Sequence, residues 1–500
     1  MLKTGAEHLE SLRDGRVIYI GNEKITDVTT HPAFRNTAQS VARIYDLKAA
    51  PEQRELMTFA DGDDRSSMYF MQPRSRDDLA KRTRAHKFIA DATYGLFGRS
   101  MDHVASWVTA LAMHPDVFES PRFSQNLLDY YAYMRKHDTF LVYAVLPPQA
   151  ARDPEFYARQ NLPIPTLRVT AEDDAGVTLN GMKMLATSAV FANEIWIGNV
   201  LPIAPTQAKE SITCAVPVAT PGVTLWSRKS FEREAQSTFD NPLSSRFDET
   251  DSMVLFDNVK IPWERVFVHD NATLCREIYS KSAAHTFGNH QSNVRFLSKL
   301  QLLVGIASHV TQSNGARDIP AVREVLGRLA AMEACLAGMI WGQSMDHETL
   351  AGGYVNFNRR YMYAALQWCT DNYGEICAIV RELCGGGVFQ MPADASVMED
   401  PHLRALFETY WRTPTQTAVD RMKLFKLAWD MLGSEFGGRH VQYEKFYAGP
   451  QFLLRGYNYR EAPWAYFDGI VSDLMAGYDL PEGAATAFTM PPFDRQAVAP

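Results

Sequence analysis

The spacing of apolar residues changes twice along the chain, and this change constrains the fold more than any other feature of the sequence. From about residue 51 to 146, apolar side chains recur every three or four positions, which predicts helices over 79–97 and 104–118. From about residue 148 to 270 they alternate in short runs, which predicts strands. Within that part, Asn180-Gly181 predicts a hairpin turn, because both residues accept positive φ.

Helical spacing returns from about residue 280 onward, over 294–310, 321–345 and 419–432. The order of helices, strands and helices excludes a fold built from alternating strand and helix units. We therefore predict a mainly α-helical protein with a central β-domain. The predicted divisions are an N-terminal helical domain at 1–147, a middle β-domain at 148–275, a C-terminal four-helix-bundle domain at 276–480 and an irregular tail at 481–500.

The charge balance argues against two classes of partner. With 58 acidic and 50 basic residues the net charge is −8, which disfavours a broad contact with nucleic acid or an anionic membrane. The start of the chain has no apolar signal segment, and charges or prolines interrupt the apolar stretches before the roughly 18 residues that span a bilayer. Six scattered cysteines without a CxxC pair predict inert thiols. We expect a cytoplasmic protein without a membrane partner.

Several common catalytic motifs are missing from the sequence. It contains no HExxH, GxxxxGK or GxSxG, and no GxGxxG after a strand, which removes the support for metalloprotease, P-loop, hydrolase and dinucleotide-fold interpretations. Three glycines at 385–387 follow a helical segment rather than a strand. A turn between helices and a phosphate-binding loop both remain open for them.

Two segments place polar groups where a ligand could meet them. Arg99 and His103 are four residues apart, so a helix would present both on one face. The alternative is a surface arginine paired with Asp102 beside an unrelated histidine. Tyr143 carries a phenol in an apolar run that ends at Pro147-Pro148, and it could face a ligand or belong to the core.

Two further segments lie in the C-terminal part. His290 stands near the predicted start of a long helix, where the helix dipole would lower its pKa and leave a neutral imidazole able to act as a base. A capping or loop histidine is the alternative. Residues 435–450 combine glycines and aromatic residues with Arg439, which suits close approach to a planar ligand. Aromatic packing between helices explains that composition equally well.

Taken together, these segments resemble the 4-hydroxyphenylacetate 3-monooxygenase family, which also includes chlorophenol and nitrophenol monooxygenases. The resemblance runs almost from end to end. Its landmarks in this sequence are Asp27 to Asn36, Gly98 to His103, Pro148-Gln149, Lys183 to Ser188, Phe256 to Phe267, His290-Gln291 and Tyr443 to Gly449.

The resemblance implies an acyl-CoA dehydrogenase-like fold, a homotetramer, and a substrate site with particular residues. Arg99 matches the arginine that contacts the substrate in the family. His103 stands where the family often has tyrosine, and Tyr143 where the phenylacetate hydroxylases have histidine. These two departures resemble the halophenol and nitrophenol branch, in which the residues matching His290 and Arg439 face the substrate. His290, Arg99 and His103 are accordingly the predicted catalytic residues.

The resemblance also implies a cofactor and a reaction. FAD would arrive as FADH2 from a separate flavin reductase, react with O2 to give a C4a-hydroperoxyflavin, and hydroxylate a phenolic ring with or without loss of a ring halide or nitro group. His290 would take the phenolic proton and Arg99 would stabilise the negative charge. The predicted flavin contacts are Gln149, Thr187, Ser188, Phe446, Ala448 and Gly449, with Arg295 and the glycines at 385–387 at the diphosphate or adenosine end.

Two other functions are weighed against this one. A hydroxylase that converts 4-hydroxyphenylacetate to a catechol is the nearer alternative, and the residues at 103 and 143 argue against it. A lyase similar to 4-hydroxybutyryl-CoA dehydratase shares the implied fold but requires thiolates for an iron–sulfur cluster. The corresponding region here offers Arg99, His103 and Lys299 without a cysteine.

Overall fold

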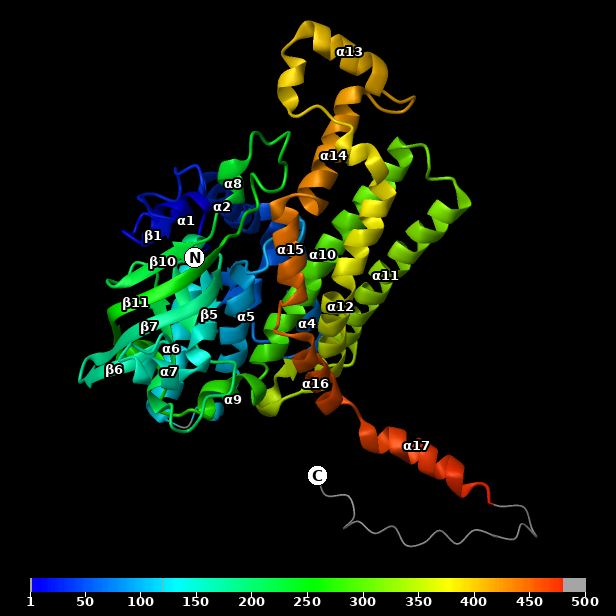
Figure 1. The fold of residues 1–500 in the computed structure, drawn as a ribbon. Helices are drawn as coiled ribbons and strands as arrows, with labels where there is room; N and C mark the ends of the chain where they lie inside the picture. The colour runs from blue at the N-terminus through cyan, green and yellow to red at the C-terminus, as the bar shows by residue number, and fades with distance from the viewer. Residues whose placement is uncertain (1, 119, 480–500) are drawn as a thin grey trace.

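Helices dominate the N-terminal part of the chain. The computed structural model describes residues 2–118 and 120–479. The helices before residue 140 are α1 (Gly5–Ser11), α2 (Arg35–Ala49), α3 (Arg54–Met57), α4 (Arg76–Ala92), α5 (Met101–Ala112) and α6 (Pro121–His137). All twelve residues of α5 are buried, which follows from its position between the sheets and the C-terminal helices (Figure 1).

Two sheets form the middle of the molecule. The first has the order β2-β1-β10-β11-β7-β6 and the second the order β12-β9-β8-β5. The strands of the first sheet are β1 (Val17–Ile20), β2 (Glu23–Ile25), β6 (Arg168–Asp173), β7 (Gly176–Thr187), β10 (Val223–Ser227) and β11 (Asp251–Pro262). Those of the second are β5 (Leu141–Ala144), β8 (Glu194–Ile197), β9 (Ile212–Pro217) and β12 (Val266–His269), and the short helices α7 (Pro154–Arg159) and α8 (Phe231–Glu234) lie in the connections.

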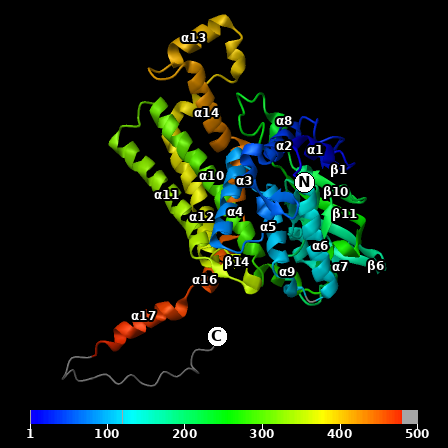
Figure 2. The same ribbon diagram turned by 180° about the vertical axis from the view of Figure 1, so that it is seen from behind.

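Long helices return after the sheets, as the apolar spacing predicts. They are α9 (Leu274–Ser280), α10 (Ala284–Ser313), α11 (Pro320–Met345), α12 (Arg359–Cys384), α13 (Pro401–Trp411), α14 (Ala418–Leu432), α15 (Glu435–Lys445), α16 (Gln451–Glu461) and α17 (Trp464–Ala476). Helices α10, α11, α12 and α14 pack together, and α10 also packs against α4 and α5. Figure 2 shows α17 extending away from this body.

Two details differ from the sequence-based expectation. The N-terminal part is not purely helical, because β1 pairs in parallel with β10, β5 pairs with β8, and β3 (Thr58–Asp61) and β4 (Asp64–Ser67) form a hairpin. A second small hairpin, β13 (Glu348–Thr349) and β14 (Val355–Asn356), lies in the C-terminal part. The glycines at 385–387, for which the sequence allows either a turn or a phosphate-binding loop, form a 3-10 turn after α12. The predicted tail at 481–500 lies outside the described residues.

The hairpin predicted at Asn180-Gly181 is wrong. These residues lie inside β7, and the chain reverses between Asp173 and Gly176 instead. There the Asp173 carboxylate accepts hydrogen bonds from the amides of Ala175 and Gly176. Gly181 has φ +117°, and a Cβ at that position would lie 2.4 Å from the carbonyl oxygen of Thr166. A close approach of another segment, rather than a turn, therefore accounts for this glycine.

Candidate active site

The loop between α4 and α5 fixes the position of Arg99. One carboxylate oxygen of Glu249 accepts hydrogen bonds from the backbone amides of Gly98 and Arg99, at 2.7 and 3.1 Å. A Cβ at Gly98 would lie 2.0 Å from the hydroxyl of Tyr443, so only glycine allows this tyrosine to approach the loop. The middle part of the chain and α15 thus hold the loop from two sides.

Arg99 is a buried cation surrounded by tyrosines. Its side chain donates to the hydroxyl of Tyr143 and, at 3.2 Å, to the backbone carbonyls of Gly98 and Tyr447. Its guanidinium carbon lies 4.8, 5.7 and 4.0 Å from the ring centres of Tyr143, Tyr443 and Tyr447. Burial opposes the charged form, but the surrounding tyrosine oxygens and the carboxylate of Glu249 outweigh it and raise the pKa of Arg99. Within residues 2–118 and 120–479, no carboxylate forms an ion pair with this side chain.

His103 lies in the first turn of α5 and joins the same cluster, although Arg99 precedes the helix. The predicted shared helical face is therefore wrong, and the two side chains meet through their common neighbours Tyr143 and Tyr447. It is 1% exposed, and its ring lies 5.7 Å from Tyr143, 5.9 Å from Trp107 and 6.3 Å from Tyr447. Its Nδ1 is 2.9 Å from Oε1 of Gln291 on α10. Burial, together with the positive charge of Arg99, lowers the pKa of His103 well below its usual range, so the imidazole is neutral.

The sequence-based prediction missed Trp107. This indole stacks on Tyr143 with ring centres 5.1 Å apart, and it packs against Gly288 of α10, where a Cβ would lie 1.6 Å from its Nε1. The signal was present, since Trp107 follows His103 at a four-residue interval on α5. We call Arg99, His103, Trp107, Tyr143, Tyr443 and Tyr447 the arginine–aromatic cluster.

The other two predicted arginines are paired with carboxylates. Arg439 on α15 donates to both oxygens of Asp251, at 3.0 and 2.7 Å, and to Glu249 at 2.7 Å. Arg295 on α10 forms a two-point pair with Glu444. Burial alone would raise the pKa of Glu444, but the charges of Arg295 and Lys299 outweigh burial and lower it to about 2. Both guanidinium groups are thus neutralised within the chain, and Arg99 differs from them in this respect.

The structure does not bring His290 to the arginine–aromatic cluster. Helix α10 begins at Ala284, so His290 lies in its second turn, further from the helix start than predicted. Its Nε2 is 2.9 Å from Oγ1 of Thr83, its Nδ1 is 2.7 Å from Oε1 of Gln343, and its ring stacks on Phe357. The pKa of His290 is lowered as expected, but burial is the main cause rather than the helix dipole. Both ring nitrogens already have partners.

The predicted flavin residues fall into two groups. Thr187 and Ser188 end β7, where Thr187 donates to Asp251 at 2.7 Å and Ser188 adopts φ +64°. Thr187 adjoins Arg439 on α15 through Asp251, and Ser188 adjoins it through Glu249. The second group is open to solvent: Gln149 is exposed, the Phe446 ring is 53% exposed, and Ala448 and Gly449 are partly exposed.

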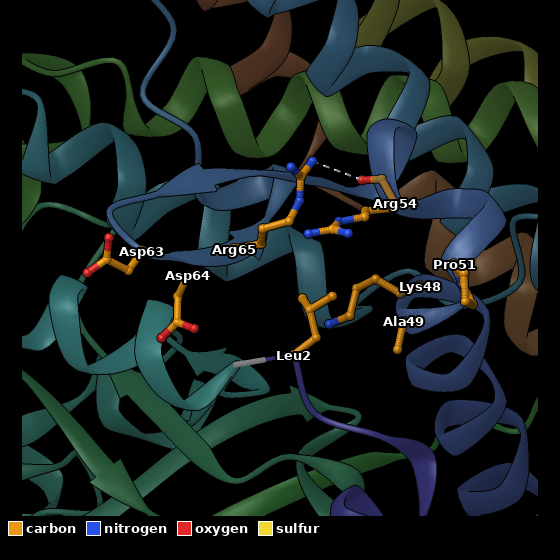
Figure 3. Close-up of a pocket in the computed structure, with 8 residues that line it drawn as sticks. All are labelled: Leu2, Lys48, Ala49, Pro51, Arg54, Asp63, Asp64 and Arg65. Carbon is orange, nitrogen blue, oxygen red and sulfur yellow. Dashed lines mark hydrogen bonds between the residues drawn. The ribbon is translucent and has the colours of Figure 1, made fainter.

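A separate opening lies in the N-terminal part. Its volume is about 440 Å³, and Figure 3 shows its lining. The lining residues are Leu2, Lys48, Ala49, Pro51, Arg54, Asp63, Asp64 and Arg65. None of the predicted site residues lines this opening, so we do not place the active site there.

Comparison with known proteins identifies the family. Residues 4–268 match the model of the 4-hydroxyphenylacetate 3-hydroxylase N-terminal part, and residues 275–476 match that of its C-terminal part. The chain is 32% identical to the pyoverdin chromophore biosynthetic protein PvcC of Pseudomonas aeruginosa, over 96% of both chains. It is also 32% identical to the oxygenase component of 4-nitrophenol 2-monooxygenase from Rhodococcus sp, over 90% of this chain and 87% of the relative.

A solved structure agrees with these relatives. The oxygenase component (HpaB) of 4-hydroxyphenylacetate 3-monooxygenase, complexed with FAD and 4-hydroxyphenylacetate, superposes with a TM-score of 0.89 and 29% identity, over 95% of this chain and 98% of that chain. The fold is therefore acyl-CoA dehydrogenase-like, as the resemblance implied. On these matches, the chain belongs to the 4-hydroxyphenylacetate 3-hydroxylase family.

Proposed function

We propose that this chain is the oxygenase component of a two-component monooxygenase that hydroxylates a phenolic ring, with O2 as co-substrate and reduced FAD from a separate flavin reductase. The arginine–aromatic cluster carries the proposal. The guanidinium of Arg99 is buried and has no carboxylate ion pair among the described residues, and Glu249 acts on it only through space, so an anionic ligand can pair with it directly. A phenolate is such a ligand, and its ring suits an enclosure of tyrosine and tryptophan side chains.

The chain's own residues account for activation of the phenol. A phenolate is a much better carbon nucleophile than a phenol. His103 is neutral and can take the proton, while Arg99 and the hydroxyl of Tyr143 stabilise the oxygen anion. General-base help of this kind contributes about 10²- to 10⁴-fold in rate. Reduced FAD, when bound, supplies the chemistry that activates O2 and transfers one oxygen atom to the ring. His290 keeps both nitrogens engaged, so this proposal gives the base role to His103.

The residues present suit a flavin. An exposed aromatic ring, a glycine with φ +95° and hydroxyl and amide side chains offer stacking and hydrogen bonds to a planar, polar cofactor. The proposed contacts are Gln149, Thr187, Ser188, Phe446, Ala448 and Gly449. Arg295 already donates two hydrogen bonds to Glu444. It could contact the flavin only if it donated to Glu444 and to the cofactor at the same time.

The substrate class is the finer part of the proposal. His103 and Tyr143 favour a halophenol or nitrophenol over 4-hydroxyphenylacetate, and the second relative described above is named for 4-nitrophenol. Ring carbons that carry a halide or nitro group would lose it on hydroxylation, whereas ring carbons that carry hydrogen would give a catechol-type product.

The experiment supplies the purified chain with FAD, NADH and any flavin reductase, and offers 4-chlorophenol, 4-nitrophenol and 4-hydroxyphenylacetate separately. We expect hydroxylated product from at least one of the two substituted phenols, at a higher kcat/KM than with 4-hydroxyphenylacetate. The Arg99→Met variant should lose this activity. Failure of the wild-type protein to hydroxylate any phenol while FADH2 is supplied would refute the proposed function.

A homotetramer in the cytoplasm completes the proposal. Large apolar side chains are exposed on α17, including Ile470 at 52% and Leu474 at 69%. Helix α11 is long and apolar enough to cross a membrane, with mean hydropathy 1.3 over an 18-residue window of which 17% is buried. Because α11 packs on α10 and α12, we explain its apolar face without a membrane. Further copies of the chain would cover the exposed apolar surfaces of α11 and α17. Light scattering of the purified protein tests this assembly.

A further inference from the structure

A chain of hydrogen bonds links His103 to a buried carboxylate through one amide side chain. Gln291 lies between them on α10. Its Oε1 is 2.9 Å from Nδ1 of His103, and its Nε2 is 3.1 Å from Oδ1 of Asp102 and 3.3 Å from Oγ of Ser100. Gln291, Asp102 and Ser100 are all buried, so water does not compete for these bonds.

The donors and acceptors in this chain can be assigned from chemistry. A carboxylate only accepts, and Asp102 already accepts from the hydroxyl of Ser100 and, at 2.7 Å, from Nδ1 of His86. The hydroxyl proton of Ser100 is used in that bond, so its oxygen is an acceptor toward Gln291. Both groups therefore require the NH2 end of the Gln291 amide. The opposite orientation would set oxygen against oxygen.

We propose that Gln291 is a positioning residue that fixes the tautomer of His103. With its NH2 held by Asp102 and Ser100, the amide presents only its carbonyl oxygen to His103. The neutral imidazole must then carry its proton on Nδ1, and Nε2 keeps a lone pair. That lone pair is the group that can take a proton from a phenol, so the carboxylate of Asp102 determines the role of His103 without touching it. The consequence for phenols rests on the proposed function, whereas the tautomer does not.

The surroundings of His103 favour the neutral ring that this assignment requires. Burial is the main cause of the lowered pKa of His103. Arg99 before α5, Arg295 on α10 and His86 on α4 lower this pKa further. Tyr143 and Tyr447 face it from β5 and from the segment after α15. A neutral ring has one proton to place, and Gln291 decides which nitrogen holds it.

His290 provides a matched comparison within the same helix. Its Nδ1 also faces a buried glutamine, Gln343, but Nε2 of that amide has no hydrogen-bond partner among the described residues. Nothing there resists a flip of the amide. The other neighbour of His290 is the hydroxyl of Thr83, which donates to the carbonyl of Leu79 at 2.9 Å and so accepts from Nε2 of His290. Replacing Gln343 therefore removes a comparable bond without breaking a link to a carboxylate.

The test uses full-length protein labelled with ¹⁵N-histidine. Nitrogen chemical shifts distinguish protonated from unprotonated ring nitrogens, and the signal missing from a His103→Gln sample identifies His103. In the wild-type protein we expect His103 protonated on Nδ1 and unprotonated on Nε2. Gln291→Met should give a mixture of tautomers, and Gln343→Met should leave the His103 signals unchanged. A wild-type spectrum with the proton on Nε2 overturns the proposal, whether or not the variants fold.

Hydroxylation of the best phenol supplies the second readout. Loss of one net hydrogen bond changes a tautomer ratio by about 2- to 12-fold, so kcat/KM of Gln291→Met should fall by a similar factor, with Gln343→Met near wild type. An equal fall in both variants overturns the positioning role. If the wild-type protein shows the expected tautomer but hydroxylates no phenol, the proposed function fails and the assignment of the proton stands.

Discussion

The pair formed by Arg295 and Glu444 allows a stability prediction with a defined size. Glu444 accepts from Arg295 at 2.9 Å and from Nζ of Lys299 at 2.5 Å, and all three side chains are buried. Glu444→Gln would leave two buried cations without a counter-charge. The pKa of Glu444 is lowered from 4.5 to about 2, which corresponds to about 3 kcal/mol at about 1.4 kcal/mol per unit. That agrees with the roughly 3–5 kcal/mol lost when one partner of a buried pair is removed.

The pH dependence follows from the direction of that shift. Because the folded-state pKa is depressed, the stabilisation is present above about pH 4.5 and is lost as the pH falls toward 2. Urea unfolding followed by circular dichroism should show Glu444→Gln less stable by about 3 kcal/mol at pH 7. At pH 3 the difference from wild type should shrink to about 1 kcal/mol.

Glu435 supplies the matched control. It pairs with Lys229 at 2.8 Å, and this pair is exposed, with 68% of the Glu435 side chain and 54% of the Lys229 side chain accessible. Glu435→Gln should cost less than about 1 kcal/mol. Equal losses in the two variants, or a difference between wild type and Glu444→Gln that does not change with pH, would refute the reasoning about this pair.

Three further outcomes are expected. Arg99→Lys keeps the charge but loses the planar donor group, so kcat/KM for the phenol should fall by about 10- to 100-fold, the equivalent of one charged hydrogen bond; an unchanged value would remove Arg99 from the site. Gly98→Ala places a methyl group 2.0 Å from the hydroxyl and 2.5 Å from two ring carbons of Tyr443, so hydroxylation should fall sharply and should stay low when Gly98→Ala is combined with Tyr443→Phe, because the ring carbons still clash. Leu474→Asp on α17 should shift the protein to a smaller assembly in light scattering, and an unchanged mass would mean that α17 takes no part in assembly.

Local spacing explains only part of the arginine–aromatic cluster. His103 and Trp107 are four residues apart on the buried helix α5, which places both on one face. Arg99 lies in the loop before α5, so its proximity to His103 does not follow from helical spacing. Helix positions in the C-terminal part were also predictable, because 3.6-residue periodicity over many turns is a strong local signal.

Pairings over long sequence distances could not be predicted in this way. The partners of Arg439 are 188 and 190 residues away, and Thr83 is 207 residues from His290. Whether a polar side chain faces a ligand or another part of its own chain depends on such distant partners. The hairpin predicted at Gly181 was wrong for the same reason. The segment around Thr166, 15 residues earlier, determines the conformation of Gly181, and the local turn signal does not.

Glu249 connects segments that are synthesised far apart in time. Its two oxygens meet the amides of Gly98 and Arg99, 151 and 150 residues earlier, and the guanidinium of Arg439, 190 residues later. The enclosure around Arg99 is consequently completed only when the last quarter of the polypeptide has left the ribosome and docked. A nascent or truncated chain that ends before α15 contains every strand of both sheets and yet leaves the proposed phenol site unfinished.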